Sequence, residues 1–268
     1  MKKKTVVISG ASRGIGAQMA RLLAGDYNVV IMAKTAEPHQ KLSGTIYSVA
    51  EEIRNLGGSV LPLRVDVRSE RQVKDAIADA VDIFGGIDAL INNASAIILN
   101  PTEKQVELMN QVIVDGTRFC TEACLPYLQK SKKPHVLNIA PPLPLAEHWV
   151  EKYGQYAKAK RAVSLYTEIM SRRHRGIIFN TLWPAKMIYT AATIALFGEE
   201  EARKHTRSPE IMADAARNIL ELKSAALSGI FFLDEKATAL ENPRRVPDFS
   251  HYLLPGSKEE DLMPDVFV

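Results

Sequence analysis

The stretch TVVISGASRGIG, residues 5–16, determines how this chain is expected to fold. Its first half is rich in β-branched residues, which is typical of a buried strand, and its second half carries three glycines. Glycine permits a tight turn and a close backbone approach, and the N-terminus of a following helix attracts phosphate. A tight turn without a ligand is the alternative, but strand, glycine turn and helix in this order predict a dinucleotide site. The residues assigned to it are Gly10, Ser12, Arg13, Gly14, Ile15 and Gly16.

Beyond this stretch, apolar runs of strand length alternate with amphipathic segments of helical length. Strands are predicted at residues 5–9, 28–33, 59–65, 89–92, 135–139, 177–182 and 229–234, and helices include 103–130 and 155–173. This alternation predicts an α/β fold, a doubly wound parallel sheet of about seven strands with helices on both faces. No linker divides the chain, so residues 1–268 are expected to form one domain, in which 241–268 wraps the surface or a neighbouring subunit.

Composition excludes several other classes of protein. The net charge of +3 and the scattered short basic runs do not predict nucleic-acid binding. No stretch is long and apolar enough to span a membrane, and no metal site is expected. Cys120 and Cys124 lie four residues apart in a predicted helix, where they suit small buried apolar positions better than a disulfide. The sequence ends in DVFV and not in a peroxisomal signal of the S-K-L type, so a cytoplasmic location is expected by default.

The residues after the second predicted strand indicate which nicotinamide cofactor binds. An NAD site typically has an acidic residue there, whereas an NADP site needs positive charge for the 2′-phosphate. The sequence has Ala33, Lys34 and Thr35 at this point, with no acid. Lys34 and Arg13 are expected to converge on that phosphate, which favours NADP(H), although each alone also suits a charged surface.

Four motifs together resemble the short-chain dehydrogenase/reductase family, over the whole chain and in the family's order. They are SGASRGIG (9–16), VDVRS (65–69), NNAS (92–95) and Tyr156-x-x-x-Lys160. Further stretches, among them LNIAPPL (137–143) and LWPAKMIYTAA (182–192), resemble one subgroup whose members carry a sterol-carrier domain; that domain would have to follow residue 268. The resemblance implies a Rossmann-type fold, NADP use and an oxidoreductase role. It also implies that Asp66 contacts the adenine, that Asn92 and Ala94 line the cofactor cleft, and that the segment from Pro184 to Thr190 folds over the nicotinamide.

Tyr156 and Lys160 are the candidate catalytic residues. Their four-residue spacing places them on one helix face, where an ammonium group lowers the pKa of a phenol. In the family, such a tyrosine would protonate the carbonyl oxygen of the substrate, and the lysine would also hold the nicotinamide ribose. A half-buried tyrosine and a solvated lysine are the alternative for this spacing taken alone.

Two positions depart from the family pattern. Ala140 stands where a serine would donate to the substrate oxygen, and Ile113 stands where an asparagine would hold a water of the proton relay. Loss of one preorganised donor typically costs on the order of 10²–10³ in rate, so slow turnover is still expected. Ser95 and His148 are the nearest candidates to replace the serine, although a turn residue and a packed or surface residue are the more common roles. The proline-rich run 141–145 is expected to make an apolar pocket rim.

Two functions therefore remain open. The first is an NADP(H)-dependent enzyme with reduced activity on a small carbonyl or alcohol substrate, lipid-like if the rim is apolar. The second is a non-catalytic NADP(H)-binding sensor or scaffold, or a subunit that only binds cofactor. A polar side chain within hydrogen-bond reach of the oxygen that Tyr156 would protonate favours the enzyme. In either case, the helices at 105–129 and around Tyr156 are expected to pair subunits into a homodimer or homotetramer, as in the family.

Overall fold

A seven-stranded sheet forms the centre of the molecule. The computed structural model describes residues 3–38, 43–98, 100–241 and 248–268. All strand pairs are parallel, and the strand order is β3-β2-β1-β4-β5-β6-β7. The strands are β1 Lys4–Ser9, β2 Tyr27–Ala33, β3 Val60–Arg64, β4 Ala89–Asn92, β5 His135–Ile139, β6 Ile178–Trp183 and β7 Phe231–Leu233. The predicted doubly wound sheet is confirmed; β7 is shorter than the predicted run 229–234.

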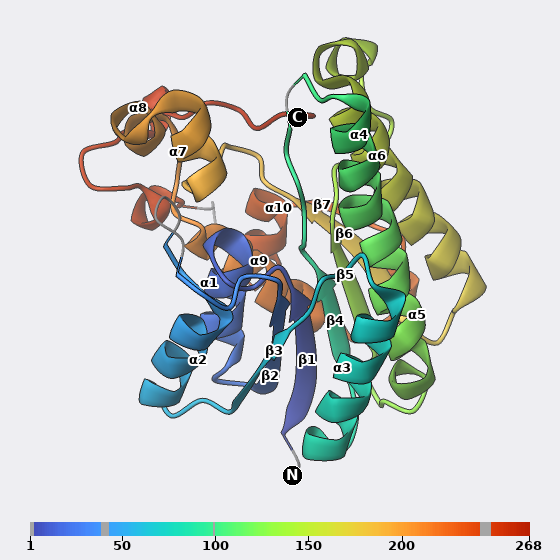
Figure 1. Ribbon diagram of the computed structural model, residues 1–268. Coiled ribbons are helices and arrows are strands. Elements are labelled where there is room, and N and C mark those ends of the chain that lie inside the picture. Colours follow the sequence, from blue (N-terminus) through green and yellow to red (C-terminus); the bar gives the residue numbers. More distant parts are fainter. Residues whose placement is uncertain (1–2, 39–42, 99, 242–247) are drawn as a thin grey trace.

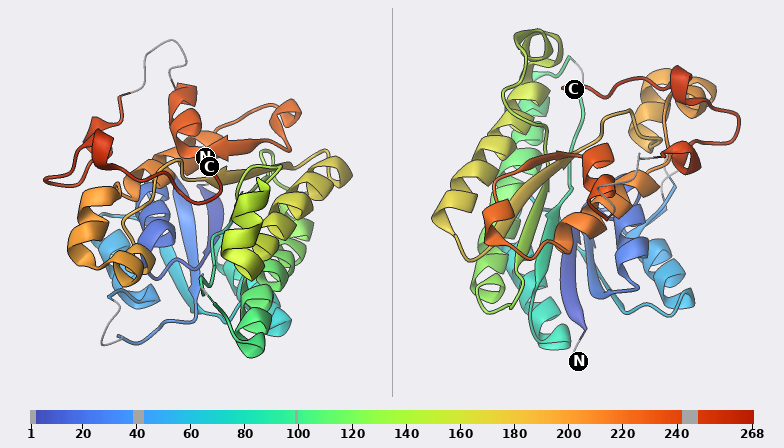
Figure 2. Two further views of the ribbon diagram at one scale, coloured as in Figure 1. Left: turned by 90° about the horizontal axis from the view of Figure 1, so that it is seen from above. Right: turned by 180° about the vertical axis from the view of Figure 1, so that it is seen from behind.

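Helices cover both faces of the sheet (Figures 1 and 2). The longer helices are α1 Gly14–Leu23, α2 Ile46–Asn55, α3 Glu70–Phe84, α5 Gly116–Leu128, α6 Glu147–Arg173 and α9 Glu210–Leu220. Shorter helices are α4 Glu103–Asn110, α7 Ala191–Phe197, α8 Glu199–His205 and α10 Asp234–Thr238. Helices α1, α2 and α9 share one apolar core with one side of the strands, and α3 and α5 share the other core with the opposite side. Because both sides of each central strand are buried, these strands are mainly apolar, and their polar side chains, such as Asn138 and Asn180, are buried as well.

The predicted helix 103–130 is one structural unit with an irregular turn inside it. Residues Gln111–Asp115 form a π-helical turn between α4 and α5. The Thr117 hydroxyl donates to the Ile113 carbonyl at 2.7 Å beside this turn. A Cβ on Gly116 would come within 2.9 Å of Val67, so glycine allows the helix to approach the segment after β3. Turns of this kind often occur at functional sites, and this one carries Ile113.

The strand order reverses between β1 and β4, and the ends of these two strands are joined closely. The Ser9 hydroxyl accepts the backbone N–H groups of Asn93 and Ala94, each at 3.1 Å. The Asn93 amide in turn donates to the carbonyls of Ser9 and Gly10. In doubly wound folds, the carboxyl ends of the strands at this reversal form the ligand crevice.

The sequence suggested that residues 241–268 wrap the surface or a neighbouring subunit. Residues 248–268 instead lie partly inside the protein. Tyr252, Leu262 and Phe267 from this part of the chain are buried. Met263 pairs with both His205 and Met187 through backbone hydrogen bonds of 3.0 and 2.9 Å. The segment, red in Figure 1, therefore crosses the upper edge of the sheet, where the strands end.

The close packing of Gly10 gives the first testable expectation. Gly10 has φ +68°, and a Cβ there would lie 2.8 Å from the Ala94 Cα. Gly10→Ala combines left-handed strain of about 1–2 kcal/mol with an overpacking cost of about 1–3 kcal/mol. We expect the free energy of unfolding in urea to fall by about 2–5 kcal/mol.

Gly176→Ala is the control, since a Cβ there meets nothing within 4 Å and the backbone is not left-handed. It is expected to change stability by less than about 0.5 kcal/mol. Equal stability of the two variants would show that the glycine loop is not packed as described.

Candidate active site

A cavity of about 460 Å³ lies at the carboxyl edge of the sheet, between the glycine loop, α6 and α7. Six residues singled out from the sequence line it. They are Ile15, Ser95, Tyr156, Lys160, Pro184 and Thr190. The other sequence-predicted residues, from Gly10 to Ala94, are outside its lining.

The glycine loop is built for close approach. Gly10 and Gly14 have φ of +68° and +57°, and a Cβ on Gly16 would lie 2.7 Å from the Gly10 carbonyl. Ser12 is buried, and Ile15 in the first turn of α1 faces the cavity. Thr190 packs beside Gly14, whose added Cβ would be 3.6 Å from the Thr190 methyl group. The positive end of the α1 dipole is therefore next to the cavity, as an anion site requires.

Lys34 and Arg13 are not equally available. The Arg13 guanidinium donates from Nε to the Ser43 carbonyl at 3.1 Å and from Nη2 to the Gly44 carbonyl at 2.9 Å. Lys34 follows β2 with a largely exposed side chain, its Nζ 3.9 Å from an Asp66 carboxylate oxygen. Arg13 thus anchors residues 43–44 to the loop, a role that the sequence did not reveal, and Lys34 is the freer cation.

Asp66 and Asn92 are both held by protein groups. The Asp66 carboxylate accepts from the Arg68 guanidinium at 2.5–3.1 Å, and this hydrogen bond lowers the pKa of Asp66. The Asn92 amide donates to Asn138 at 2.8 Å and to Thr121 at 3.1 Å inside the protein. Asn92 therefore braces β4 against β5 and α5, and its neighbour Asn93 lines the cavity.

Tyr156 and Lys160 lie on α6 just after a break in that helix. Gly154 has non-helical dihedrals, φ 48° and ψ −115°, so the regular helix resumes directly before Tyr156. Both side chains are buried, at 4% and 3% exposure. The Lys160 ammonium donates to the Ile139 carbonyl at 2.8 Å and is 6.0 Å from the centroid of the Tyr156 ring. The predicted pair is thus brought together at the end of β5.

Burial governs the ionisation of this pair. Desolvation raises the pKa of Tyr156, with a further rise from the Asp265 charge and a reduction from hydrogen bonding to Ser95. Desolvation lowers the pKa of Lys160 to about 7, against an opposing effect of Asp265. The expectation that a neighbouring cation lowers the pKa of Tyr156 is therefore wrong in this structure, because desolvation dominates and the pKa is raised.

The two departures from the family pattern are apolar and buried here. Ala140 is fully buried, and its N–H donates to the Leu182 carbonyl. Ile113 is buried in the π-helical turn. Ser95, in contrast, lines the cavity and lies near enough to the Tyr156 hydroxyl to lower its pKa. His148 is exposed against Trp149, with ring centroids 4.5 Å apart, and is not part of the cavity lining.

The mouth of the cavity is apolar, but residues 141–145 do not form it. Ile97, Leu196 and Phe197 line the cavity and are more than a third exposed. Pro141 is buried, and its carbonyl accepts from the Ser164 hydroxyl at 2.7 Å. The expected rim is therefore wrong in position, because the proline-rich run packs onto α6 and α7 supplies the apolar wall.

Residues 262–268 complete the site, and sequence reasoning missed them. Phe267 stacks on Tyr156 with centroids 5.9 Å apart and lies 5.7 Å from Trp183. The Trp183 indole donates to the Val266 carbonyl at 2.7 Å. Asp265 and Val266 line the cavity. No pattern near the end of the sequence indicates these contacts, because they join residues about 80–110 positions apart.

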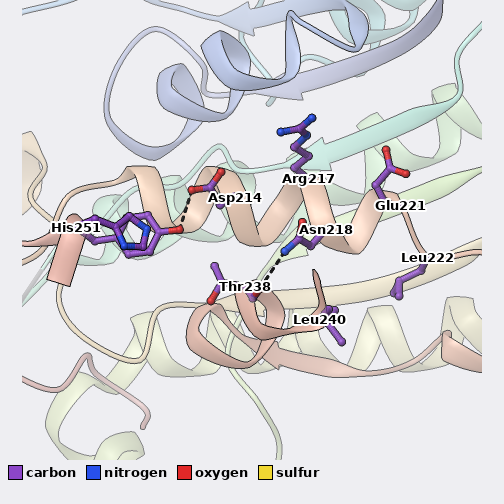
Figure 3. A pocket seen from close by; sticks show the side chains of 9 residues that line it. Asp214, Arg217, Asn218, Glu221, Leu222, Thr238, Leu240 and His251 are labelled. Carbon is purple, nitrogen blue, oxygen red and sulfur yellow. Dashed lines mark hydrogen bonds between the residues drawn. The ribbon is translucent and has the colours of Figure 1, made fainter. Parts of the chain in front are cut away.

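A second hollow, on α9, is made of groups that partner one another (Figure 3). The Tyr252 hydroxyl donates to the Asp214 carboxylate at 2.7 Å. The Asn218 amide donates to the carbonyls of Ala237 and Thr238, both at 3.2 Å. These bonds hold α9 to α10 and to residue 252, so they explain the polar lining without a ligand.

Other expectations concern cysteine, metal and membrane. Cys120 and Cys124 are free and buried, and desolvation raises the pKa of Cys120 to about 12. Among the residues that the structure describes, no cluster of three or more His, Cys, Asp or Glu side chains is placed to hold a metal ion. Over the same residues, every helix is too short or too polar to cross a membrane.

Sequence comparison defines the class of protein. The family of short chain dehydrogenases matches residues 4–200, and the chain belongs to this family of oxidoreductases that bind a nicotinamide cofactor. Hydroxysteroid dehydrogenase-like protein 2 from Danio rerio is 45% identical over 271 residues, and the protein of that name from Homo sapiens is 44% identical over 271 residues. Each alignment covers 98% of this chain and 63% of the relative, so the chain spans about two thirds of these relatives' length.

Solved structures agree with this assignment. A structure described as a dehydrogenase from Xanthomonas campestris has 41% identity and a TM-score of 0.92, covering 100% of this chain and 98% of that one. A short chain dehydrogenase from Mycobacterium thermoresistibile has 40% identity and a TM-score of 0.90, covering 100% and 95%. The fold and its family are therefore those that the four motifs predicted.

The aromatic contacts of Phe267 can be tested through tryptophan fluorescence. The chain has two tryptophans, Trp149 and Trp183, and both rings lie within about 6 Å of the Phe267 ring. We expect Phe267→Ala to shift the native emission to longer wavelength, because both indoles lose an apolar neighbour. Val268→Ala, at an exposed position, is the control. An unchanged spectrum in Phe267→Ala would contradict the described packing of residues 262–268.

Proposed function

We propose that this chain is an NADP(H)-dependent oxidoreductase that interconverts a carbonyl and an alcohol through Tyr156 and Lys160. One observation carries the proposal. A single cavity joins Ile15, at the start of α1, to the buried Tyr156 and Lys160. A cofactor whose pyrophosphate lies at the N-terminus of α1 would have its reactive ring beside this pair. The chain's own task is then to position the two reactants and to move a proton.

The ionisation of the pair suits the reductive direction. A phenol whose pKa is raised by burial stays protonated at neutral pH, as a proton donor to a carbonyl oxygen must. Bound NADPH would supply the hydride. Lys160, whose pKa is lowered to about 7, exchanges its proton readily near neutral pH and can restore the proton on Tyr156.

Ser95 is the group that we assign to the role of the missing serine. Ser95 lines the same cavity as Tyr156, and hydrogen bonding to Ser95 lowers the pKa of Tyr156, so the Ser95 hydroxyl is placed to donate to the same substrate oxygen. Asn93 is the amide in the cavity lining, but it donates to the carbonyls of Ser9 and Gly10, so we assign no residue to the role of the asparagine that Ile113 replaces. We therefore expect turnover below that of a site with both usual groups, since each preorganised donor is worth on the order of 10²–10³ in rate.

NADP is favoured over NAD by charge at the end of β2. Lys34 follows the strand directly, and none of residues 33–35 is the acidic residue that would accept the hydrogen bonds of a ribose 2′-hydroxyl in an NAD site. Its exposed ammonium suits a 2′-phosphate. Asp66, 3.9 Å from Lys34, lies on the same side of the sheet and is assigned to the adenine.

The substrate that fits best is apolar and bulky. Ile97, Leu196 and Phe197 form an exposed apolar mouth, which suits a lipid-like carbonyl or alcohol. The similar proteins described as hydroxysteroid dehydrogenase-like make an apolar alcohol a consistent choice.

The same proposal includes assembly into a homodimer or homotetramer and a cytoplasmic location. The exposed Leu165 and Ile169 on α6 suit an interface between subunits.

The second candidate is a non-catalytic NADP(H)-binding protein. Buried Ala140 and Ile113 favour it, because they leave the substrate oxygen without the two usual polar neighbours. Ser95 and Asp265 in the same cavity favour the enzyme.

Turnover by Tyr156 separates the two candidates. With the purified protein, NADPH oxidation is followed over a panel of apolar ketones and aldehydes. We expect Tyr156→Phe to lower kcat by at least about 10²-fold, because the proton donor is lost, and to leave NADPH binding unchanged. Tyr47→Phe, at an exposed position on α2, is the control. NADPH binding without turnover by the wild type across the panel would favour the sensor.

Cofactor choice is tested at Lys34. Titration of the fluorescence of NADPH and NADH gives both dissociation constants. We expect Lys34→Ala to weaken NADPH binding by about 10- to 100-fold, the value of a charge-assisted hydrogen bond, and to leave NADH binding unchanged. Lys158→Ala, on the exposed face of α6, controls for net charge. An equal loss of affinity for NADPH and NADH would contradict the assignment of Lys34 to the 2′-phosphate.

A further inference from the structure

The cavity that holds Tyr156 has two lysines in its wall. Lys160 is buried, whereas Lys152 is exposed near the start of α6. The exposed part of the same wall is otherwise apolar and includes Leu196 and Phe197. The function proposed above uses the apolar mouth and the buried lysine, but it gives Lys152 no role.

Two aromatic rings hold the Lys152 ammonium beside the cavity. Its Nζ lies 5.5 Å from the centroid of the Tyr153 ring and 5.8 Å from a ring centroid of Trp149. Tyr153 itself lines the cavity. Contacts of this kind place a positive charge, but they supply no acceptor oxygen for its three N–H donors. The ammonium is therefore positioned at the cavity wall with its hydrogen-bonding capacity unused.

The alternative is that Lys152 neutralises an acidic side chain of the protein. Among the residues that the structure describes, no carboxylate oxygen lies within 4.0 Å of its ammonium. Glu151 precedes it directly, and residues one apart do not face each other on a helix. Asp265 lines the same cavity, but desolvation raises its pKa well above the ordinary value, which favours the neutral form. Lys152 thus has no acidic partner in the described part of the chain.

A second hollow of about 460 Å³ begins at the same lysine. It lies between α4 and the start of α6, and Lys152 and Tyr153 line both cavities. Its other lining residues include Glu103, Glu151 and Gln155, so this side is polar and carries two carboxylates. A negatively charged ligand is repelled by them. Lys152 therefore marks the end of the cavity at which a negative group would be held.

One aromatic cluster separates Lys152 from the candidate proton donor. The centroid of the Phe267 ring lies 5.9 Å from that of Tyr156 and 5.7 Å from that of Tyr153. The Lys152 ammonium follows at 5.5 Å from the Tyr153 centroid. Three contacts, each shorter than about 6 Å, thus connect the phenol to the exposed cation. A linear molecule with a carbonyl at one end and an anion at the other can reach both.

We propose that Lys152 is a specificity-determining residue that binds a carboxylate at the far end of the substrate, so that the substrate is an apolar carbonyl or alcohol with an acidic end group. The inference rests on the proposed function. The apolar mouth holds the body of such a molecule, and the Lys152 ammonium donates charge-assisted hydrogen bonds to its carboxylate. One lysine matches the single charge of a carboxylate better than the double charge of a phosphate.

The direct test is the binding of matched ligands. The probes are straight-chain keto acids of several lengths, with the ketone next to the methyl end, and the methyl ester of each. The protein is titrated in the presence of NADP⁺, and tryptophan emission gives the dissociation constants, because Trp149 lies beside Lys152 and Trp183 lines the cavity. The measured quantity is the ratio of the dissociation constant of the ester to that of the acid.

Lys152→Gln removes the charge and keeps much of the side-chain length. At the best-fitting chain length, we expect it to lower the ratio by about 5- to 20-fold, between the value of an exposed ion pair and that of a desolvated charge-assisted hydrogen bond. Lys152→Glu is expected to lower the ratio further, and Lys152→Arg is expected to retain most of it. Lys158→Gln removes the same charge from an exposed position of α6 outside the cavity lining and is expected to keep the wild-type ratio.

Two results would overturn the proposal. One is a wild-type ratio in both Lys152→Gln and Lys152→Glu. The other is a wild-type protein that binds none of the keto acids.

Kinetics separate this inference from the proposed function. If the wild type oxidises NADPH with a keto acid as substrate, we expect Lys152→Gln to raise KM for the acid with little change in kcat, because the lost contact is remote from the reacting carbon. Acid binding that depends on Lys152, in a protein without turnover, supports the carboxylate site and overturns the enzyme. Turnover with the same preference between acid and ester in wild type and Lys152→Gln overturns the role of Lys152 and leaves the enzyme intact.

Discussion

The junction between the ends of β1 and β4 is the constraint on which the site depends. One hydroxyl, that of Ser9, accepts two backbone N–H groups, and the Asn93 amide returns two bonds to the glycine loop. These hydrogen bonds hold the glycine loop so close to residues 93–94 that only glycine fits at position 10. Because the strand order reverses here, the same contact opens the crevice in which Ile15 and Asn93 line one cavity.

A buried polar chain extends this order to the catalytic helix. Asn92 donates to Asn138, and the Asn138 amide donates to the Thr167 hydroxyl on α6 at 2.8 Å. Buried amides are costly when unpaired, so this chain fixes how far β4, β5 and α6 can slide relative to one another. Tyr156 and Lys160 lie two to three turns before Thr167 on the same helix. The position of Tyr156 and Lys160 at the end of β5 is therefore fixed by buried amide and hydroxyl groups that do not take part in the reaction.

The sequence predicted the fold well because local patterns determine most of it. Six of the seven strands begin and end within one residue of their predicted limits, since each is a mainly apolar run of strand length. The Tyr156 and Lys160 pair was predicted from its spacing together with the other three family motifs. The π-helical turn, the tethering of Arg13 and the packing of Phe267 were not, because each depends on a partner distant in sequence or on backbone geometry that no residue pattern encodes. Asn92 shows a related limit: its position was foreseen, but its hydrogen bonds run into the core.

The loss of two polar residues changes which groups can offset desolvation at this site. Ala140 and Ile113 supply no donor, so Tyr156 and Lys160 are buried among fewer dipoles than a serine and an asparagine would provide. Under those conditions, the remaining charged groups interact more strongly, since less polar material screens them. Asp265 enters the cavity from beyond residue 200, where the match to the family ends. Whether such a site is active therefore cannot be judged from the motif residues alone, because side chains that the motifs do not include, such as Asp265, line the same cavity.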